Sequence, residues 1–172
     1  MIWEVFRQEA SGEPHEHCGN VHAPDRVMAK QFSVIQHGRR KPTQSLWVAP
    51  QGKVSGVYGD EDAGPVDGEV TWEVFRQDRA GGYHTHCGDV TAGSVDAAKA
   101  TADEQYGADD PHSLWIVQSS YIGEITADEV AFGGTTNKAY RFAQTYNVDP
   151  AAEEVAASES EQVAAEQRGG KN

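Results

Sequence analysis

Apolar and polar residues alternate at the start of the chain in a pattern that predicts a β-hairpin. Trp3-Glu4-Val5-Phe6-Arg7 has the aromatic and β-branched content that suits a pleated sheet. A polar turn containing Gly12 can reverse the chain, so that residues 15–22 return as a second strand. Leu46-Trp47-Val48 is the next strongly apolar run, and it indicates a third strand that is central in its sheet.

Between the second and third predicted strands, the apolar spacing becomes helical. A helix from about Pro24 to His37 would place Met28, Phe32 and Ile35 on one face. Gly38 is positioned to end this helix. The predicted order is therefore strand, strand, helix, strand.

This pattern occurs twice along the chain. Residues 3–8, Trp-Glu-Val-Phe-Arg-Gln, return letter for letter as residues 72–77, at an offset of 72 − 3 = 69. The offset is 113 − 45 = 68 once the third strands are reached. A second helix is expected from its N-cap Ser94 to Gly107. Its apolar stripe is slimmer and comprises Val95, Ala98, Ala102 and Tyr106.

A copy of roughly fifty residues buries little surface, so we expect the two copies to share a core. The predicted fold class is α+β: two ββαβ repeats form a pseudo-dimer, with antiparallel sheets and helices packed on one face. The extension through Tyr121-Ile122-Gly123-Glu124-Ile125 is expected to have no counterpart after the first copy. The predicted domains are a first repeat at 1–53, an acidic Gly/Pro linker at 54–70, a second repeat with a C-terminal extension at 71–148, and an acidic, disordered Ala/Glu-rich tail at 149–172.

Charge and hydropathy exclude some functions. The formal net charge is −13, from 27 acidic and 14 basic residues. Nucleic acid is not expected as a partner, because phosphate binding needs a basic stripe that the chain lacks. No apolar run has the length of a membrane span, and no leader pattern opens the sequence, so we expect a cytoplasmic protein without a membrane partner. The acid excess also suggests a halophilic cytoplasm as a habitat hypothesis.

The sharpest local motif is His-x-His-Cys, which occurs in both copies. Imidazole and thiolate are natural ligands of zinc and copper. On a strand, however, His15 and His17 point to one face and Cys18 to the other, so the three cannot close on one ion without a bulge. A metal site would need the copies to converge through His15, His17, His84 and His86. The alternative is that these histidines line the sheet surface or the contact between repeats.

Other chemistry is sparse in the sequence. It contains no serine elbow, zinc-protease helix or phosphate loop, so we predict no enzyme activity for the chain by itself and no cofactor. The basic run Arg39-Arg40-Lys41 could pair with carboxylates of another subunit, or be a solvated loop. Its aligned segment Ala108-Asp109-Asp110 is acidic. The four tryptophans are expected in the core or between the repeats: Trp3, Trp47, Trp72 and Trp115.

Taken in order, these segments resemble the PaaB family, a small subunit of the multicomponent phenylacetyl-CoA epoxidase. A family member has a Tyr/Trp-Glu-Val-Phe strand, a His-x-His-x-Gly strand, a helix, an Arg-Arg loop, a Ser-x-Trp-Val-Val strand and a Lys-x-Tyr-Arg ending. Copy one fits through residues 3–6, 15–19, 39–40 and 45–48 but lacks the ending. Copy two fits through residues 72–75, 84–88 and 113–117 and ends with Lys138-Ala139-Tyr140-Arg141 to Tyr146, but has Asp109-Asp110 in the loop.

The resemblance implies a noncatalytic structural subunit. In that enzyme the di-iron site belongs to a ferritin-like catalytic subunit, and the small subunit pairs with itself to bridge catalytic heterodimers. The tandem chain would be a covalent version of that self-pair. Its partners would be the catalytic and structural subunits of a phenylacetyl-CoA epoxidase-like complex, with Arg39 and Arg40 docking one subunit and Tyr140, Arg141 and Tyr146 lying along another.

Two other functions stay open on the sequence alone. One is a standalone metal-binding or redox-responsive protein that uses the duplicated His-x-His-Cys segments. The other is a small acyl-ligand-binding protein of ferredoxin-like fold, with its pocket between sheet and helices.

Overall fold

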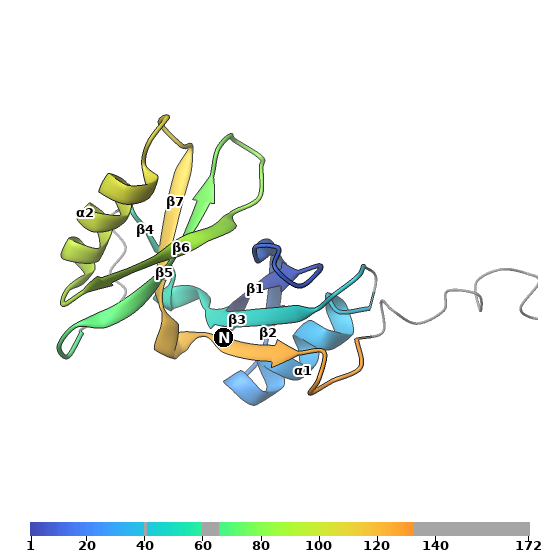
Figure 1. Cartoon of the computed structure of the whole chain (residues 1–172). Helices are drawn as coiled ribbons and strands as arrows, with labels where there is room; N and C mark the ends of the chain where they lie inside the picture. Colours follow the sequence, from blue (N-terminus) through green and yellow to red (C-terminus); the bar gives the residue numbers. More distant parts are fainter. Residues whose placement is uncertain (40, 60–65, 133–172) are drawn as a thin grey trace, which may run out of the picture. The chain divides into compact units, whose positions relative to one another are not determined.

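The computed structural model describes residues 1–39, 41–59 and 66–132 (Figure 1). It shows an α+β protein with an antiparallel sheet and two helices, as predicted for the fold class. The first part contains β1 (Ile2–Gln8), β2 (Glu16–His22), α1 (Arg26–Gln36), β3 (Ser45–Pro50), the 3-10 turn η1 (Gln51–Lys53) and β4 (Ser55–Gly56). The second part contains β5 (Val70–Gln77), β6 (Thr85–Ala92), α2 (Val95–Tyr106), β7 (Ser113–Gln118), the 3-10 turn η2 (Ser119–Tyr121) and β8 (Gly123–Thr126).

Both helices begin at a side-chain cap. The Asp25 carboxylate accepts a hydrogen bond from the Met28 backbone N–H at 2.9 Å, so α1 begins two residues later than the predicted Pro24. The predicted cap of α2 is correct, since the Ser94 hydroxyl accepts from a backbone N–H at 3.1 Å. No helix in these described ranges is long and apolar enough to cross a membrane.

The packed face of α1 differs from the predicted one. Met28 and Phe32 pack against the core, as predicted, but Ile35 is 52% exposed. Ala29 and Ser33 are fully buried and lie at the centre of the packed face. At 100° per residue Ile35 is turned well away from that centre, so its assignment to the buried face was wrong.

The two parts share one sheet, whereas separate sheets were predicted. The strand order is β4-β7-β5-β6-β2-β1-β3-β8, and every pairing is antiparallel. The parts join where Glu16 of β2 faces Thr85 of β6. The His17 N–H donates to the His84 carbonyl and the His86 N–H to the His15 carbonyl, both at 2.8 Å. Since Glu16 and Thr85 are aligned at offset 69, the junction is reciprocal.

The outermost strands are exchanged between the two parts. β8 follows the second part in sequence but pairs with β3, whose Val48 faces Gly123. β4 follows the first part but pairs with β7, whose Ile116 faces Ser55. Ser55 and Gly123 are aligned at offset 68, so β8 has a counterpart in β4, and the prediction that it has none was wrong. β4 itself falls within the segment predicted as a linker, residues 54–70.

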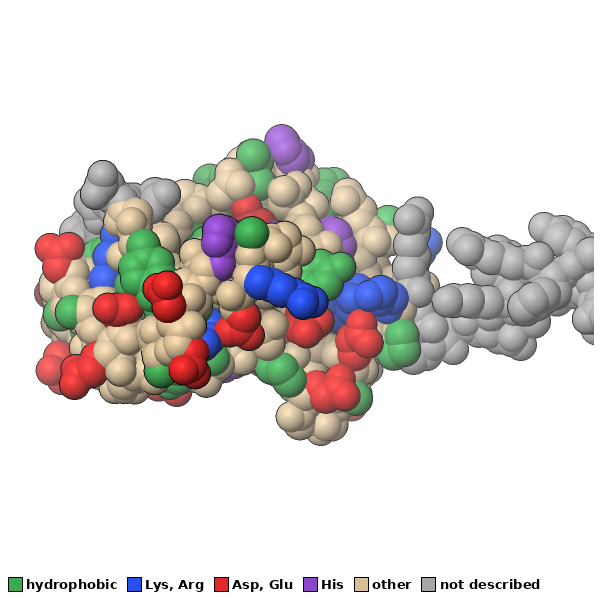
Figure 2. Space-filling model, turned by 90° about the horizontal axis from the view of Figure 1, so that it is seen from above, with side chains coloured by type: hydrophobic (Ala, Val, Ile, Leu, Met, Phe, Trp, Pro, Cys, Tyr) green, Lys and Arg blue, Asp and Glu red, His purple; other side chains and the backbone are tan. Residues whose placement is uncertain are grey.

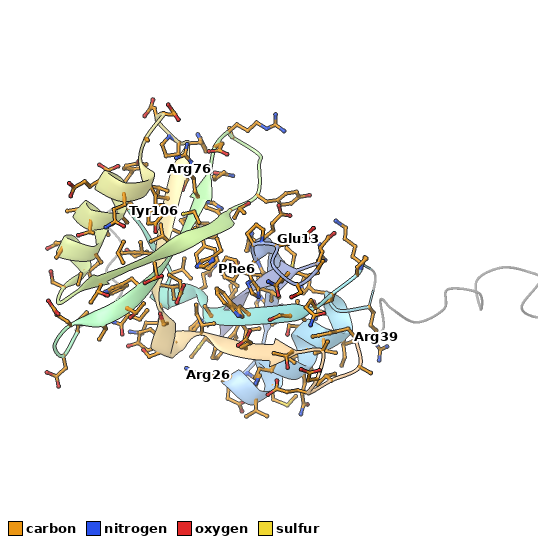
Figure 3. All side chains as sticks on the ribbon, in the orientation of Figure 1. Phe6, Glu13, Arg26, Arg39, Arg76 and Tyr106 are labelled. Atoms are coloured by element: carbon orange, nitrogen blue, oxygen red, sulfur yellow. The ribbon has the colours of Figure 1, made fainter. Side chains whose placement is uncertain are left out.

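Three apolar clusters stabilise this arrangement. One lies between α1 and strands that include β1 and β3, and an equivalent one lies under α2. The third lies on the opposite face of the sheet and combines Phe6 and Ala49 with Phe75 and Val117. The rings of Phe6 and Phe75 stack with centroids 4.1 Å apart (Figure 3 labels Phe6 between the two parts). The predicted shared core is therefore present, and all four tryptophans pack in these clusters.

Candidate functional site

A β-bulge sets the direction of the His-x-His-Cys side chains. In the β1–β2 ladder, Val5 faces Gly19 and Phe6 faces His17, so that Cys18 is the extra residue. Gly19 has φ +131°, and a Cβ there would lie 2.9 Å from Cε1 of His37, so the position favours glycine. β6 has the same bulge opposite Val74 and Phe75 of β5, with Cys87 as the extra residue. The bulge leaves His17 on the Phe6 face, while Cys18 packs against the α1 core.

The first histidine of each motif stacks on a tryptophan of the same repeat. His15 lies 3.8 Å from Trp47, and His84 lies 3.5 Å from Trp115, measured between ring centroids. His15 Nε2 is 3.1 Å from Ser45 Oγ, and that hydroxyl donates to a carboxylate oxygen of Glu124 in β8. Since the serine has one proton to donate, Nε2 of His15 must carry the proton of its hydrogen bond.

The second histidine of each motif pairs with a glutamate on the neighbouring strand. His17 Nε2 is 2.7 Å from Glu4 Oε2, and His86 Nε2 is 2.8 Å from Glu73 Oε2. Each histidine also contacts a tryptophan of the other repeat edge-on. The centroid distances are 5.3 Å from His17 to Trp115 and 5.1 Å from His86 to Trp47. We call this cluster of histidines, glutamates, tryptophans and the two stacked phenylalanines the seam. It is defined by Glu4, Phe6, His15, His17, Trp47, Glu73, Phe75, His84, His86 and Trp115.

Burial is the main cause of the pKa shifts of two seam histidines, His15 and His84. Burial lowers the pKa of His15 to about 4, with the neighbouring His86 as the second cause. Burial also lowers the pKa of His84 to about 4, with a histidine of the first repeat as the second cause. For Glu73, burial raises the pKa, but hydrogen bonds from His86 and Ser119 outweigh it and the pKa lies below its ordinary value. His15 and His84 are therefore neutral near pH 7.

The potential metal ligands are separated by this geometry. Within residues 1–39, 41–59 and 66–132, no three or more His, Cys, Asp or Glu side chains are grouped to hold a metal ion. The Cys18 thiol donates to the Val5 carbonyl at 3.4 Å, and the Cys87 thiol donates to the Val74 carbonyl at 3.3 Å. Burial raises the pKa of both thiols to about 11, so they are protonated and poorly reactive near neutral pH.

The basic loop begins where α1 ends. Arg39 is exposed and forms no ion pair with another residue of the described chain. Figure 3 shows Arg26 and Arg39 at opposite ends of α1. The Lys41 ammonium lies 3.7 Å from a Glu9 oxygen that also accepts from Arg7 at 3.1 Å. The other predicted partner-binding residues lie outside the described residues: Arg40, Tyr140, Arg141 and Tyr146.

The end of the described chain packs beside this loop. Phe132 is 2% exposed and belongs to the cluster under α1. A Cβ on Gly38 would lie 2.7 Å from Cδ1 of Phe132, so the close approach requires glycine. The exchanged β8 thus brings the chain that follows the second repeat to the loop of the first repeat.

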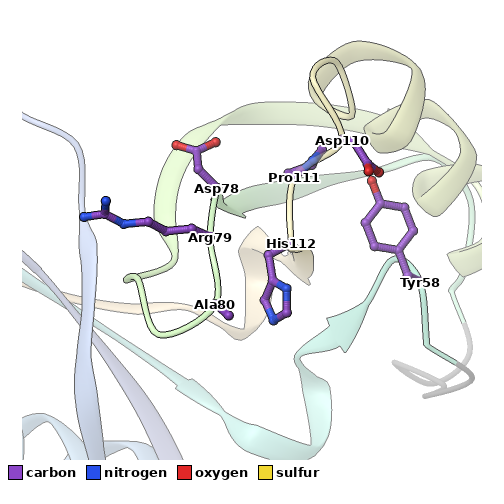
Figure 4. Close-up of a pocket in the computed structure, with 7 residues that line it drawn as sticks. All are labelled: Tyr58, Asp78, Arg79, Ala80, Asp110, Pro111 and His112. Atoms are coloured by element: carbon purple, nitrogen blue, oxygen red, sulfur yellow. The ribbon is translucent and has the colours of Figure 1, made fainter.

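The aligned loop of the second repeat borders an open hollow of about 490 Å³ (Figure 4). Its lining includes Asp78 and Asp110, which align at offset 69 with Glu9 and Lys41. Asp78 accepts a hydrogen bond from Arg76 Nε at 2.6 Å. In Figure 4 the Arg79 side chain points away from the other lining side chains. Asp110 therefore stands where the basic loop has Lys41, whereas Asp78 keeps the negative charge of Glu9.

Sequence reasoning missed the polar partners of the histidines. The second histidine of each motif bonds to a glutamate, Glu4 or Glu73. The first histidine of each motif bonds to a serine, Ser45 or Ser113. A signal was present, because both residue types are identical in the two copies at the aligned positions. Glu124 could not be recognised in this way, since its aligned residue in β4 is Gly56.

These features define the class of protein: an α+β chain of two aligned parts that join in one antiparallel sheet and share an apolar cluster. A family model described as "PaaB: Phenylacetic acid degradation B" matches residues 1–67 and again residues 70–153. The chain therefore belongs to the PaaB family as a tandem duplication, which confirms the resemblance and links it to phenylacetic acid degradation. No curated protein and no solved structure matches the chain.

Proposed function

We propose that the chain is a noncatalytic assembly subunit of a multicomponent, cytoplasmic oxygenase that epoxidises the ring of phenylacetyl-CoA. The observation that carries the proposal is the match of the PaaB family model to both halves of the chain. The two ββαβ repeats act as a pseudo-dimer, a covalent form of the pair that single-copy subunits make with themselves.

Reciprocal contacts support the pseudo-dimer. Phe6 stacks on Phe75, the residue aligned with it at offset 69. The β2–β6 junction is likewise formed by aligned residues, and β4 and β8 are exchanged between the repeats. Contacts between identical positions are those of an isologous interface. A fused pair has this property if it derives from a symmetric dimer.

The partner-binding role is assigned to the first repeat and to the ending of the chain. Arg39 is exposed at the end of α1, and Phe132, after which the ending follows, packs against Gly38. In this proposal Arg39 and Arg40 dock one partner subunit, and Tyr140, Arg141 and Tyr146 lie along another. Arginine suits this role because its planar group pairs with a carboxylate through two hydrogen bonds.

Co-expression with the catalytic and structural subunits of the epoxidase tests the proposal. We expect the chain to co-migrate with them in size-exclusion chromatography, and Arg39→Glu combined with Arg40→Glu to weaken the complex roughly tenfold or more. The matched control is Asp109→Asn with Asp110→Asn, because asparagine tolerates the positive φ of 64° and 51° at these positions. The control should leave the complex intact.

The result that would overturn the proposal is a chain that never co-migrates with these subunits. If the complex forms unchanged with the arginine-substituted chain, the assembly role is supported but the docking role of the basic loop is contradicted.

A further inference from the structure

The two helical segments carry opposite charge. Residues 26–41 contain five basic residues and no acidic one, whereas the aligned residues 95–110 contain five acidic residues and one basic one. Figure 2 shows many carboxylates at its left end, over the half that carries α2. In a chain with a net charge of −13, the segment around α1 is a local exception.

The outward face of α1 is also apolar where α2 is acidic. Val27 is 64% exposed and Ile35 is 52% exposed. The residues aligned with them at offset 69 are Asp96 and Glu104. Since α2 forms with acids at these positions, the helix does not need apolar residues there in order to fold. Of the two helices, only α1 exposes large apolar side chains, and an exposed apolar surface marks an interaction site.

A hollow of about 270 Å³ continues this face toward β8. It is lined by Lys30 and Val34 of α1 together with Ile125 and Val130, of which Val130 is 36% exposed. Glu129 also lines the hollow, and its carboxylate accepts a hydrogen bond from the Thr126 backbone N–H at 3.2 Å.

Polar contacts occupy the aligned positions of the second repeat. Lys99, aligned with Lys30, donates to the Gly59 carbonyl at 2.7 Å. Asp103, aligned with Val34, accepts from the Tyr58 hydroxyl at 2.9 Å. The second repeat therefore uses these positions for polar contacts within the chain, whereas in the first repeat the half-buried Lys30 and Val34 line the hollow.

We propose that the outward face of α1 is the docking surface for a partner protein subunit that presents an apolar centre bordered by carboxylates. We call it the docking face and define it by Val27, Lys30, Gln31, Val34, Ile35 and Val130. The valines and Ile35 supply the apolar centre, and Lys30 and Arg39 supply charges that complement the carboxylates. The inference rests on the proposed function. It adds to that function that each chain has one docking face, whereas a symmetric pair would have two.

A second copy of the chain is the less suitable occupant. The acidic α2 would match the charge of the docking face, but its outward positions Asp96 and Glu104 offer no apolar surface. Contact between α1 of one chain and α2 of the next would also be head-to-tail, which produces rings or open filaments.

The test substitutes into α1 the residues that α2 carries at the aligned positions, Val27→Asp and Ile35→Glu. The matched control is Asp96→Asn with Glu104→Gln in α2. The probe is the set of co-expressed epoxidase subunits, and affinity is measured by titrating them against each purified chain. We expect the α1 variant to bind roughly tenfold more weakly or worse and the control to bind normally. Binding of the unaltered chain should also weaken as salt concentration rises.

The folded state of each variant is checked by circular dichroism and urea unfolding, where both are expected to match the unaltered chain because the substituted sites are exposed. Normal binding by a folded α1 variant would overturn the docking face while leaving the proposed function standing. A failure of the unaltered chain to bind any of these subunits would overturn the proposed function and this inference together.

Two further outcomes would assign the face to another occupant and so overturn the inference. One is concentration-dependent self-association of the isolated chain that Val27→Asp with Ile35→Glu abolishes. The other is a change in hydrogen exchange of residues 149–172 in the isolated α1 variant, which would indicate the chain's own C-terminal segment.

Discussion

At the residue scale, the seam shows how burial determines what a histidine can do. His15 and His84 are held between a tryptophan ring and a serine hydroxyl, and both are nearly inaccessible to water. Such a position favours the neutral ring, because a charged imidazolium would lose its hydration without gaining a carboxylate partner. The histidines that do face carboxylates are the other two, His17 and His86.

This environment predicts a pH dependence of stability. The pKa of His15 and His84 is about 4 in the folded chain and 6.5 as the ordinary value, so the unfolded chain binds protons that the folded chain does not. The free energy of unfolding should therefore be highest above pH 6.5 and fall as the pH is lowered toward 4. Urea midpoints measured across this window would show the decline.

The control for this prediction is His15→Gln with His84→Gln, which retains hydrogen-bonding capacity without the titration. Its stability should vary less with pH between 6.5 and 4.5. Glu73 does not contribute to the slope in this window. Its pKa in the folded chain lies below 4.5, so its contribution to the free energy of unfolding is lost only as the pH falls below that value. An equal slope in the variant and the unaltered chain would contradict the assignment.

At the scale of elements, the exchange of β4 and β8 makes each repeat depend on a strand from the other. Ile125 of β8 is 2% exposed in the cluster under α1, although it follows the second repeat in sequence. Val57, aligned with it at offset 68, packs in the cluster under α2, although it follows the first repeat. The Glu124 carboxylate of β8 also accepts hydrogen bonds from the Ser45 hydroxyl and the Trp47 indole N–H of β3.

We therefore predict crossed effects of two matched substitutions. Ile125→Ala should lower the free energy of unfolding by about 2–4 kcal/mol, because it leaves a cavity in a packed cluster. In native-state hydrogen exchange it should reduce protection in α1 and β3 more than in α2 and β7. Val57→Ala should do the reverse, with a smaller effect because Val57 is only half-buried. Loss of protection in α2 and β7 after Ile125→Ala would argue against the exchange.

At the scale of the whole molecule, the two repeats are joined by the exchanged strands, a short strand junction and a shared apolar cluster. The junction has one facing pair, Glu16 with Thr85, flanked by two backbone hydrogen bonds. The cluster adds the Phe6–Phe75 stack and Ala49 with Val117. Because the junction is so short, packing in this cluster is expected to supply much of the coupling between repeats.

A double-mutant cycle on Phe6 and Phe75 tests this. We expect Phe6→Leu and Phe75→Leu to destabilise the chain with a coupling energy of about 0.5–1.5 kcal/mol, as found for aromatic pairs in contact. The control cycle uses Trp3→Phe and Trp72→Phe, which lie in separate clusters and should be additive. Urea unfolding measures both cycles. Additive effects at Phe6 and Phe75 would indicate that the repeats are coupled elsewhere.

The sequence by itself determined the repeat, most of the local elements and the family. These features depend on neighbours along the chain: helix caps such as Ser94, the strand pattern of Trp3-Glu4-Val5-Phe6-Arg7, and the order of short motifs. It also indicated that Cys18 turns away from His17, because side chains on a strand alternate between faces. The structure adds a bulge, which leaves Cys18 on the face opposite His17.

Only the tertiary structure decided the single sheet, the exchanged strands and the partners of the seam histidines. Each depends on contacts between distant residues, such as Ser45 with Glu124, which no local pattern encodes. The tertiary structure also decided the orientation of α1. The spacing of Ile35 is that of a buried stripe, but the small residues Ala29 and Ser33 face the sheet and allow a close approach, which leaves Ile35 facing outward. The size of the side chains at the contact determines how closely a helix packs, and the periodicity of hydrophobic residues does not show this size.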